Sequence, residues 1–223
     1  MKQTKFDKMI AMMVVMLLAL GNPVGCSGTE PKSEESADAD YEAEFNPDEV
    51  VDSEEHDMTT VIDGCDTFTQ ILDKEENKGM GYINVHIGDD DVLLMASETY
   101  EYDTDLYAAI DAEIFCYKDD SPTYMGYVTA GGTAYPLSVK DGVLYVGGNH
   151  FMTKYTIRYD ELVIIEETYV MYDTDGNATY YYRAEGEDFS DYSSEEAEQK
   201  FYSLFDEMDE ESILYFETVG GLE

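Results

Sequence analysis

Apolar and polar residues alternate with a period of two along most of the chain between residues 82 and 183. Such alternation is typical of strands that bury one face of a sheet and expose the other. The clearest case is residues 106–118, where Asp111 and Glu113 point away from an apolar row made of Ala108, Ile110, Ala112, Ile114 and Cys116. This segment is therefore predicted to be a half-buried antiparallel strand, with the Cys116 side chain facing inward.

Turn residues separate the predicted strands at short intervals. The pair Asp141-Gly142 is the clearest hairpin signal, because Asp and Gly accept the positive φ angles of a tight turn. Short connections favour antiparallel neighbours, so the sequence predicts a β-meander of eight to ten strands curled into a barrel or a sandwich. The predicted strands are residues 82–87, 91–100, 106–118, 124–129, 133–139, 143–146, 151–158, 162–172, 178–183 and, near the C-terminus, 213–219.

Helical periodicity occurs on both sides of this strand region. Thr67 and Gln70 have the spacing of a capping box at the start of a short helix. Ser193 and Glu196 form a second capping box, followed by an apolar stripe of Ala197, Phe201, Leu204, Phe205 and Met208. The second helix should pack on the sheet, so residues 58–223 are predicted to form one α+β domain.

The N-terminus has the layout of a secretory signal peptide over residues 1–25. Lys2, Lys5 and Lys8 precede an unbroken apolar run from Met9 to Leu20. As a helix this run would measure roughly 18 Å, well short of the roughly 30 Å hydrocarbon core of a bilayer. The segment therefore indicates export and does not suit a membrane span.

The end of this signal, Val24-Gly25-Cys26, resembles the lipobox of bacterial lipoproteins, although Pro23 stands where that family has Leu. The resemblance implies cleavage before Cys26 and a lipid on its sulfur, which would anchor the protein to the cell membrane, facing outside. The alternative is cleavage after Gly21, at an Ala-x-Gly site formed by Ala19 and Gly21. That cleavage would give a secreted protein without a lipid. Residues 130–150 resemble uncharacterised extracellular lipoproteins of Gram-positive bacteria, and this likeness implies no site residues.

The charge of the chain excludes several kinds of partner. The chain has 51 Asp and Glu against 12 Lys and Arg, a formal net charge of −39. Such a surface repels phosphates, so no nucleic-acid partner is expected. Residues 26–57 are acidic and lack apolar periodicity, which predicts a disordered tether behind the lipid. Residues 58–223 hold enough apolar and aromatic material for a core.

Cysteines and acidic turns are the candidates for covalent and metal chemistry. If Cys26 carries lipid, Cys65 and Cys116 form a pair that is either a disulfide or two separately buried thiols. The alternating Asp173, Asp175 and Asn177 invite a calcium interpretation. The same residue types suit a hairpin turn, so we expect no cofactor, with Ca²⁺ at this turn as the alternative.

The sequence contains no recognised catalytic motif. His150 follows a glycine turn and is expected at a loop edge open to solvent, where it is an outside candidate for acid–base work. Tyrosines recur along the predicted strands and suit stacking on sugars, a protein interface or plain packing: Tyr124, Tyr127, Tyr135, Tyr145, Tyr155, Tyr169 and Tyr180 to Tyr182.

These features predict a non-enzymatic surface lipoprotein whose β-domain binds a wall polymer, a glycan or a protein. The alternative is a secreted hydrolase of glycans or peptides that uses an Asp/Glu pair. Because 51 residues of the chain are acidic, the sequence alone does not single out such a pair.

Overall fold

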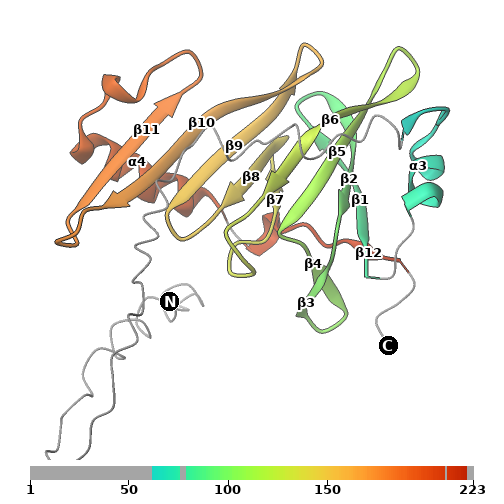
Figure 1. Ribbon diagram of the computed structural model, residues 1–223, viewed down its shortest axis with the longest axis horizontal. Helices are drawn as coiled ribbons and strands as arrows, with labels where there is room; N and C mark the ends of the chain where they lie inside the picture. The colour runs from blue at the N-terminus through green and yellow to red at the C-terminus, as the bar shows by residue number, and fades with distance from the viewer. Residues whose placement is uncertain (1–61, 76–78, 209, 220–223) are drawn as a thin grey trace, which may run out of the picture. The chain divides into compact units, whose positions relative to one another are not determined.

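The computed structural model describes residues 62–75, 79–208 and 210–219 (Figure 1). The predicted signal peptide, Cys26 and the acidic tether lie outside these residues. The α-helices are α3 (Phe68–Glu75) and α4 (Ser194–Glu207), and the short 3-10 helices are η2 (Phe189–Asp191) and η3 (Glu210–Ser212).

Within the described residues, the strands form two antiparallel sheets of five strands each and one separate hairpin (Figure 1). The first sheet has the order β12 (Glu217–Thr218), β1 (Gly81–Ile87), β2 (Asp90–Ala96), β5 (Asp111–Lys118) and β6 (Ser121–Thr129). The second sheet has the order β11 (Ala178–Ala184), β10 (Glu161–Tyr172), β9 (Phe151–Arg158), β8 (Val143–Gly147) and β7 (Ser138–Lys140). The separate hairpin consists of β3 (Tyr100–Asp103) and β4 (Leu106–Ala108).

The two sheets share one hydrophobic core, which confirms the predicted antiparallel α+β fold. The first sheet contributes Val92, Leu94, Ala112, Ile114 and Cys116 to this core. The second sheet contributes Leu144, Val146, Tyr155 and Ile157. Because the strands belong to two sheets that pack through this core, the arrangement is sandwich-like. Its strands also outnumber the eight to ten expected, since the described residues contain twelve.

The segment before β12 runs from the edge of the second sheet to the edge of the first. Ile213 forms a β-bridge with Ser138 of β7. Val219 then donates a backbone hydrogen bond to the Met80 carbonyl, 2.8 Å away beside β1. Between these points the Phe216 side chain enters the shared core. The predicted strand 213–219 is thus mostly a connecting segment, and only Glu217–Thr218 pair as a strand.

Each sheet carries a helix on the face that points away from the shared core. Helix α3 packs on the first sheet through Ile71, which contributes to a cluster with Met80, Leu93, Met95 and Phe115. Helix α4 packs on the second sheet through a cluster of Ala197, Leu204, Tyr145, Met152 and Tyr182. Both capping boxes are confirmed, by side-chain bonds between Thr67 and Gln70 and between Ser193 and Glu196.

The prediction of one continuous strand over residues 106–118 is wrong. The segment divides into β4 and β5, which pair with different partners. The physical reason lies at Ala109. Its carbonyl accepts a hydrogen bond from the Leu137 N–H of a loop at 3.0 Å, so it does not pair with a neighbouring strand. The inward position of Cys116 is confirmed, since the residue is 1% exposed. The predicted strand 133–139 is also wrong over most of its length, because β7 begins only at Ser138.

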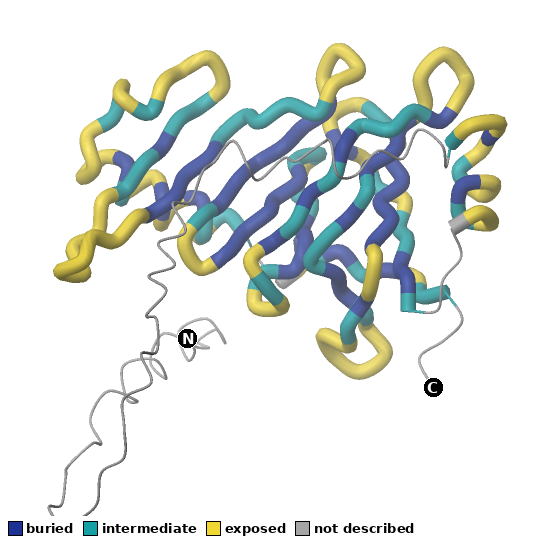
Figure 2. Tube along the Cα trace, viewed as in Figure 1, coloured by how far each residue is buried: buried dark blue, intermediate teal, exposed yellow. Residues whose placement is uncertain are grey.

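Tight turns join several of the hairpins, and the exposed ends of the hairpins stand out in Figure 2. Asp141 and Gly142 have φ angles of 51° and 77°, which confirms the predicted turn. Tyr159 and Asp160 adopt the same left-handed conformation, with φ angles of 54° and 62°. Tyr159 is a bulky residue in a conformation that suits Asn, Asp or Gly, and its side chain is 95% exposed.

We predict that Tyr159→Asn stabilises the fold. Asn tolerates the left-handed conformation, so the free energy of unfolding should rise by about 1 kcal/mol. The melting temperature should then rise by roughly 2–4 °C in thermal denaturation. Asp119→Asn is the matched control, because Asp119 holds the same position in the β5–β6 turn with φ 51° and is already a favoured residue. Equal effects of the two substitutions would contradict the prediction.

Candidate functional site

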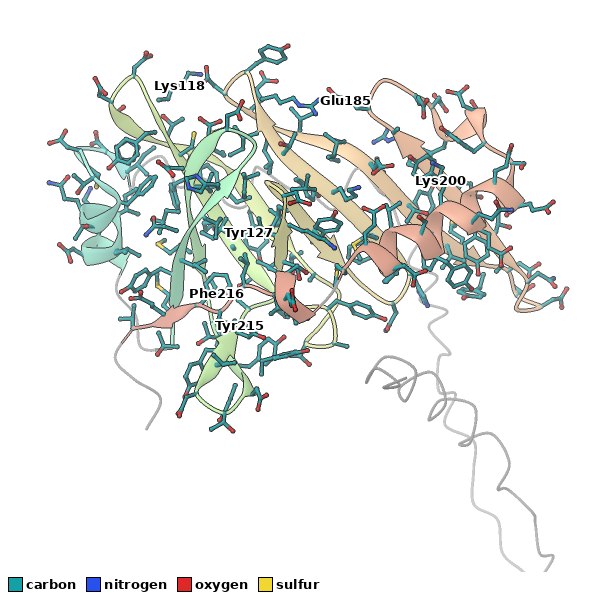
Figure 3. All side chains as sticks on the ribbon, turned by 180° about the vertical axis from the view of Figure 1, so that it is seen from behind. Lys118, Tyr127, Glu185, Lys200, Tyr215 and Phe216 are labelled. Carbon is teal, nitrogen blue, oxygen red and sulfur yellow. The ribbon has the colours of Figure 1, made fainter. Side chains whose placement is uncertain are left out.

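The outer face of the second sheet lies under α4, which crosses β9, β10 and β11 (Figure 3). Strand alternation places Lys154 of β9, Glu166 of β10 and Tyr182 of β11 on this face. Near the end of α4, Glu207 approaches the same lysine. An ionic cluster therefore lies beside the apolar contact between sheet and helix.

Lys154 is the centre of this cluster, and its side chain is only 10% exposed. Its Nζ atom lies 2.5 Å from a Glu166 carboxylate oxygen and 2.9 Å from a Glu207 carboxylate oxygen. Tyr182 donates its hydroxyl hydrogen to Glu166 at 2.6 Å, and Tyr145 donates to Glu207 at 3.2 Å. The lysine thus joins three elements, β9, β10 and α4, through charge-assisted hydrogen bonds.

Lys154 and Glu166 keep their charges near neutral pH. Burial by itself would lower the pKa of Lys154, but the hydrogen bonds to Glu166 and Glu207 outweigh it and raise that pKa. Burial would raise the pKa of Glu166, but the hydrogen bonds from Lys154 and Tyr182 outweigh it and lower that pKa. The raised pKa makes Lys154 a weaker acid, and the lowered pKa makes Glu166 a weaker base, than the free side chains. The contacts themselves connect α4 to β9 and β10.

An exposed group of aromatic side chains lies at one end of the same face. We define this aromatic strip as His150, Tyr172, Tyr180 and Tyr202. The ring centroids of His150 and Tyr172 are 5.4 Å apart, and those of Tyr180 and Tyr202 are 6.1 Å apart. Tyr172 and Tyr202 are each 54% exposed, and the predicted exposure of His150 is confirmed.

Several contacts fix the strip, although its members come from distant parts of the sequence. The Tyr180 ring packs edge-on against buried Phe201 of α4, with 5.4 Å between centroids. The Tyr180 backbone N–H donates to the Ser194 hydroxyl at 2.9 Å, which ties β11 to the start of α4. The hydroxyl oxygens of Tyr180 and Tyr202 are 3.2 Å apart, and their hydrogen bond raises the pKa of Tyr180, as do burial and nearby negative charge.

The predicted tyrosines do not gather on one surface. Tyr145, Tyr155 and Tyr182 are buried. Tyr169 stacks on Tyr181 on the opposite face of the second sheet, with centroids 4.6 Å apart and 13° between the rings. Of the tyrosines singled out from the sequence, only Tyr180 belongs to the aromatic strip.

Sequence analysis missed Tyr172 and Tyr202. Tyr172 is the last residue of β10, directly before the turn, and Tyr202 stands beside the apolar stripe of α4. The positions of Tyr172 at the end of a strand and of Tyr202 beside the apolar stripe were the available signals. No local pattern, however, says that one lies near the other.

A pair of carboxylates lies on the outer face of the first sheet. Asp111 accepts hydrogen bonds from the Ser97 hydroxyl and, at 3.2 Å, from the Tyr127 hydroxyl. Burial and the charge of Asp111 raise the pKa of Tyr127 to about 12. Glu113, two residues along β5 and on the same face, accepts a hydrogen bond from the Tyr124 hydroxyl at 2.6 Å. The hydrolase alternative named no residues, and Asp111 with Glu113 is one Asp/Glu pair that the fold places on a single face.

The two candidate disulfide residues are not brought together. Cys116 lies in the core between the sheets, whereas Cys65 belongs to the cluster under α3 on the other face of the first sheet. Both are buried, and no disulfide joins them. Burial raises the pKa of the Cys116 thiol, which disfavours the reactive thiolate.

The acidic turn between β10 and β11 uses its carboxylate to shape the backbone. Asp173 accepts hydrogen bonds from the Asp175 N–H at 3.0 Å and from the Asn177 N–H at 2.7 Å. The Asn177 side chain adds a bond of 2.8 Å, and these bonds lower the pKa of Asp173. Within the described residues, no group of three or more His, Cys, Asp or Glu is arranged to hold a metal ion.

We predict that Lys154→Met destabilises the fold by about 2–4 kcal/mol in chemical denaturation, because Glu166 and Glu207 lose their shared cation. Lys118→Met is the matched control. Lys118 pairs with Asp160 at 3.3 Å on the surface, so its loss should cost under about 1 kcal/mol. A Lys154→Met chain as stable as the Lys118→Met chain would show that the cluster does not anchor α4.

Comparison with known proteins yielded no relative. No family model, curated protein or solved structure matches this chain. Neither described helix is long and apolar enough to cross a membrane. The function must therefore be argued from the site itself.

Proposed function

We propose that this protein is a membrane-anchored extracytoplasmic lipoprotein whose β-rich domain binds a glycan of the cell wall without altering it. The location rests on the signal at residues 1–25, on the lipobox-like Cys26 and on the acidic tether that follows. The binding function rests on one observation, which is the aromatic strip held open to solvent on a fixed strand-and-helix support.

The chemistry of the strip suits sugars. A tyrosine ring offers a flat apolar face for stacking and a hydroxyl for hydrogen bonding, and ordering its side chain costs little entropy. Tyr172 and Tyr202 keep about half of their surface accessible although their neighbours are packed. A set of rings pre-positioned by strands and a helix is better suited to binding than the same rings on a mobile loop.

The tether gives the proposed function its setting. A chain of the length of residues 26–57, with high charge and few apolar residues, should extend and hold the domain away from the lipid surface. The domain could then reach wall polymers outside the membrane. Buried acyl chains contribute about 0.8 kcal/mol per CH₂ group, and more than one chain gives a stable anchor.

The anchor is tested by replacing its cysteine. Cys26→Ser should move the protein from the membrane fraction to the culture medium, because the thiol that carries the lipid is lost. Mass spectrometry of the wild-type N-terminus should identify an acylated Cys26. A mature chain that begins at Asn22 would instead establish secretion without a lipid.

The binding site is tested with single substitutions in the strip. Tyr172→Ala and Tyr202→Ala should each weaken sedimentation with purified cell-wall polysaccharide by about fivefold or more, because each removes an exposed stacking ring. Tyr159→Ala is the matched control, since Tyr159 is 95% exposed in the β9–β10 turn, at the opposite end of these strands from His150 and Tyr172. Equal losses in all three variants, or no binding by the wild type, would refute a glycan site at the strip.

The hydrolase alternative would use a different part of the fold, the outer face of β5. Asp111 and Glu113 share a face of β5, and each accepts a hydrogen bond from a tyrosine hydroxyl. A two-carboxylate mechanism would use such a pair on either side of the scissile bond. Activity on a panel of glycans or peptides that disappeared in Glu113→Gln would favour this alternative over simple binding.

A further inference from the structure

Acidic residues lie next to the aromatic strip on α4 and in the β10–β11 turn. On α4, Glu198 stands one helical turn before Tyr202 and Asp206 stands one turn after it. Glu198 is half-buried and Asp206 is exposed. The charge of Glu198 also acts on Tyr180, whose pKa it helps to raise. On the other side of the strip, the turn that follows Tyr172 contains two further acidic residues, Asp173 and Asp175.

Each Lys and Arg of the second sheet and α4 contacts a partner that is not a member of the strip. Lys154 is held by Glu166 and Glu207, and the Lys200 amine lies 4.9 Å from the centroid of the Tyr182 ring. The others also have partners away from the strip: Lys140 bonds the Glu207 carbonyl, Arg158 pairs with Glu185, and Arg183 pairs with Glu167 on the opposite face. The charged residues next to the rings of the strip are therefore mainly acidic.

We propose that the strip selects glycans that carry protonated amines, such as polymers of amino sugars without their acetyl groups. This inference rests on the proposed glycan-binding function and adds the charge of the ligand. A protonated amine is attracted to the faces of tyrosine rings and to the carboxylates beside them. Anionic wall polymers meet repulsion at the same place, and neutral sugars gain only the stacking.

The ligand charge is tested with three sugar hexamers of similar length. Isothermal titration of the full mature chain bearing Cys26→Ser would use the hexamers of glucosamine, N-acetylglucosamine and galacturonate. The glucosamine hexamer should bind at least about tenfold more tightly than its acetylated counterpart, and galacturonate should bind least. If the acetylated hexamer binds as tightly as the amine, the charge inference fails while the glycan function stands. If no hexamer binds, both fail.

Matched variants separate the strip from the general negative charge of the protein. Glu198→Gln with Asp206→Asn removes two charges beside the strip and should reduce the preference for glucosamine to about threefold or less. Asp119→Asn with Asp120→Asn removes two charges at the β5–β6 turn and should leave the preference unchanged. Tyr202→Ala keeps the net charge and should still weaken glucosamine binding. Equal effects of the two charge variants would mean nonspecific attraction and would overturn the inference.

Discussion

The ion pairs of Lys154 are the interaction on which the candidate site depends. A lysine that is 10% exposed cannot lose its carboxylate partners without leaving a poorly solvated charge. Because Glu166 belongs to β10 and Glu207 to α4, the lysine ties the helix to the sheet. Helix α4 carries Tyr202, and the ring of its Phe201 packs edge-on against the ring of Tyr180. The position of Tyr202 beside Tyr180 thus depends in part on where this cluster places the helix.

The central strand of each sheet is buried on both faces, and this burial explains much of the remaining architecture. Strands β2 and β9 are buried along nearly their whole length, which is typical of strands covered on two sides. One side of each strand faces the shared core, and the other lies under α3 or α4. Many acidic side chains consequently lie at hairpin ends and on helix surfaces, whereas Glu166 and Glu167 within β10 pair with Lys154 and Arg183. A chain with a net charge of −39 can therefore still form an apolar core.

Sequence analysis succeeded where neighbouring residues decide the structure and failed where distant ones compete. The strand at 151–158 and the helix that follows Ser193 were predicted correctly, because strand alternation and capping boxes depend on residues only a few positions apart. The strand predicted at 106–118 was interrupted because the Ala109 carbonyl bonds to Leu137, far along the chain. The tyrosines were correctly assigned to strands in most cases, but their alternation does not say which face meets a helix.

The sequence by itself determined the class of the fold, the Asp141-Gly142 turn and the start of α4, because each depends on local backbone preferences. Only the tertiary structure decided that Cys65 and Cys116 lie in different clusters and that Lys154 meets two carboxylates. It also brought His150, Tyr172, Tyr180 and Tyr202 into one strip. These contacts join segments that strand pairing and helix docking bring together, and no local pattern encodes such proximity.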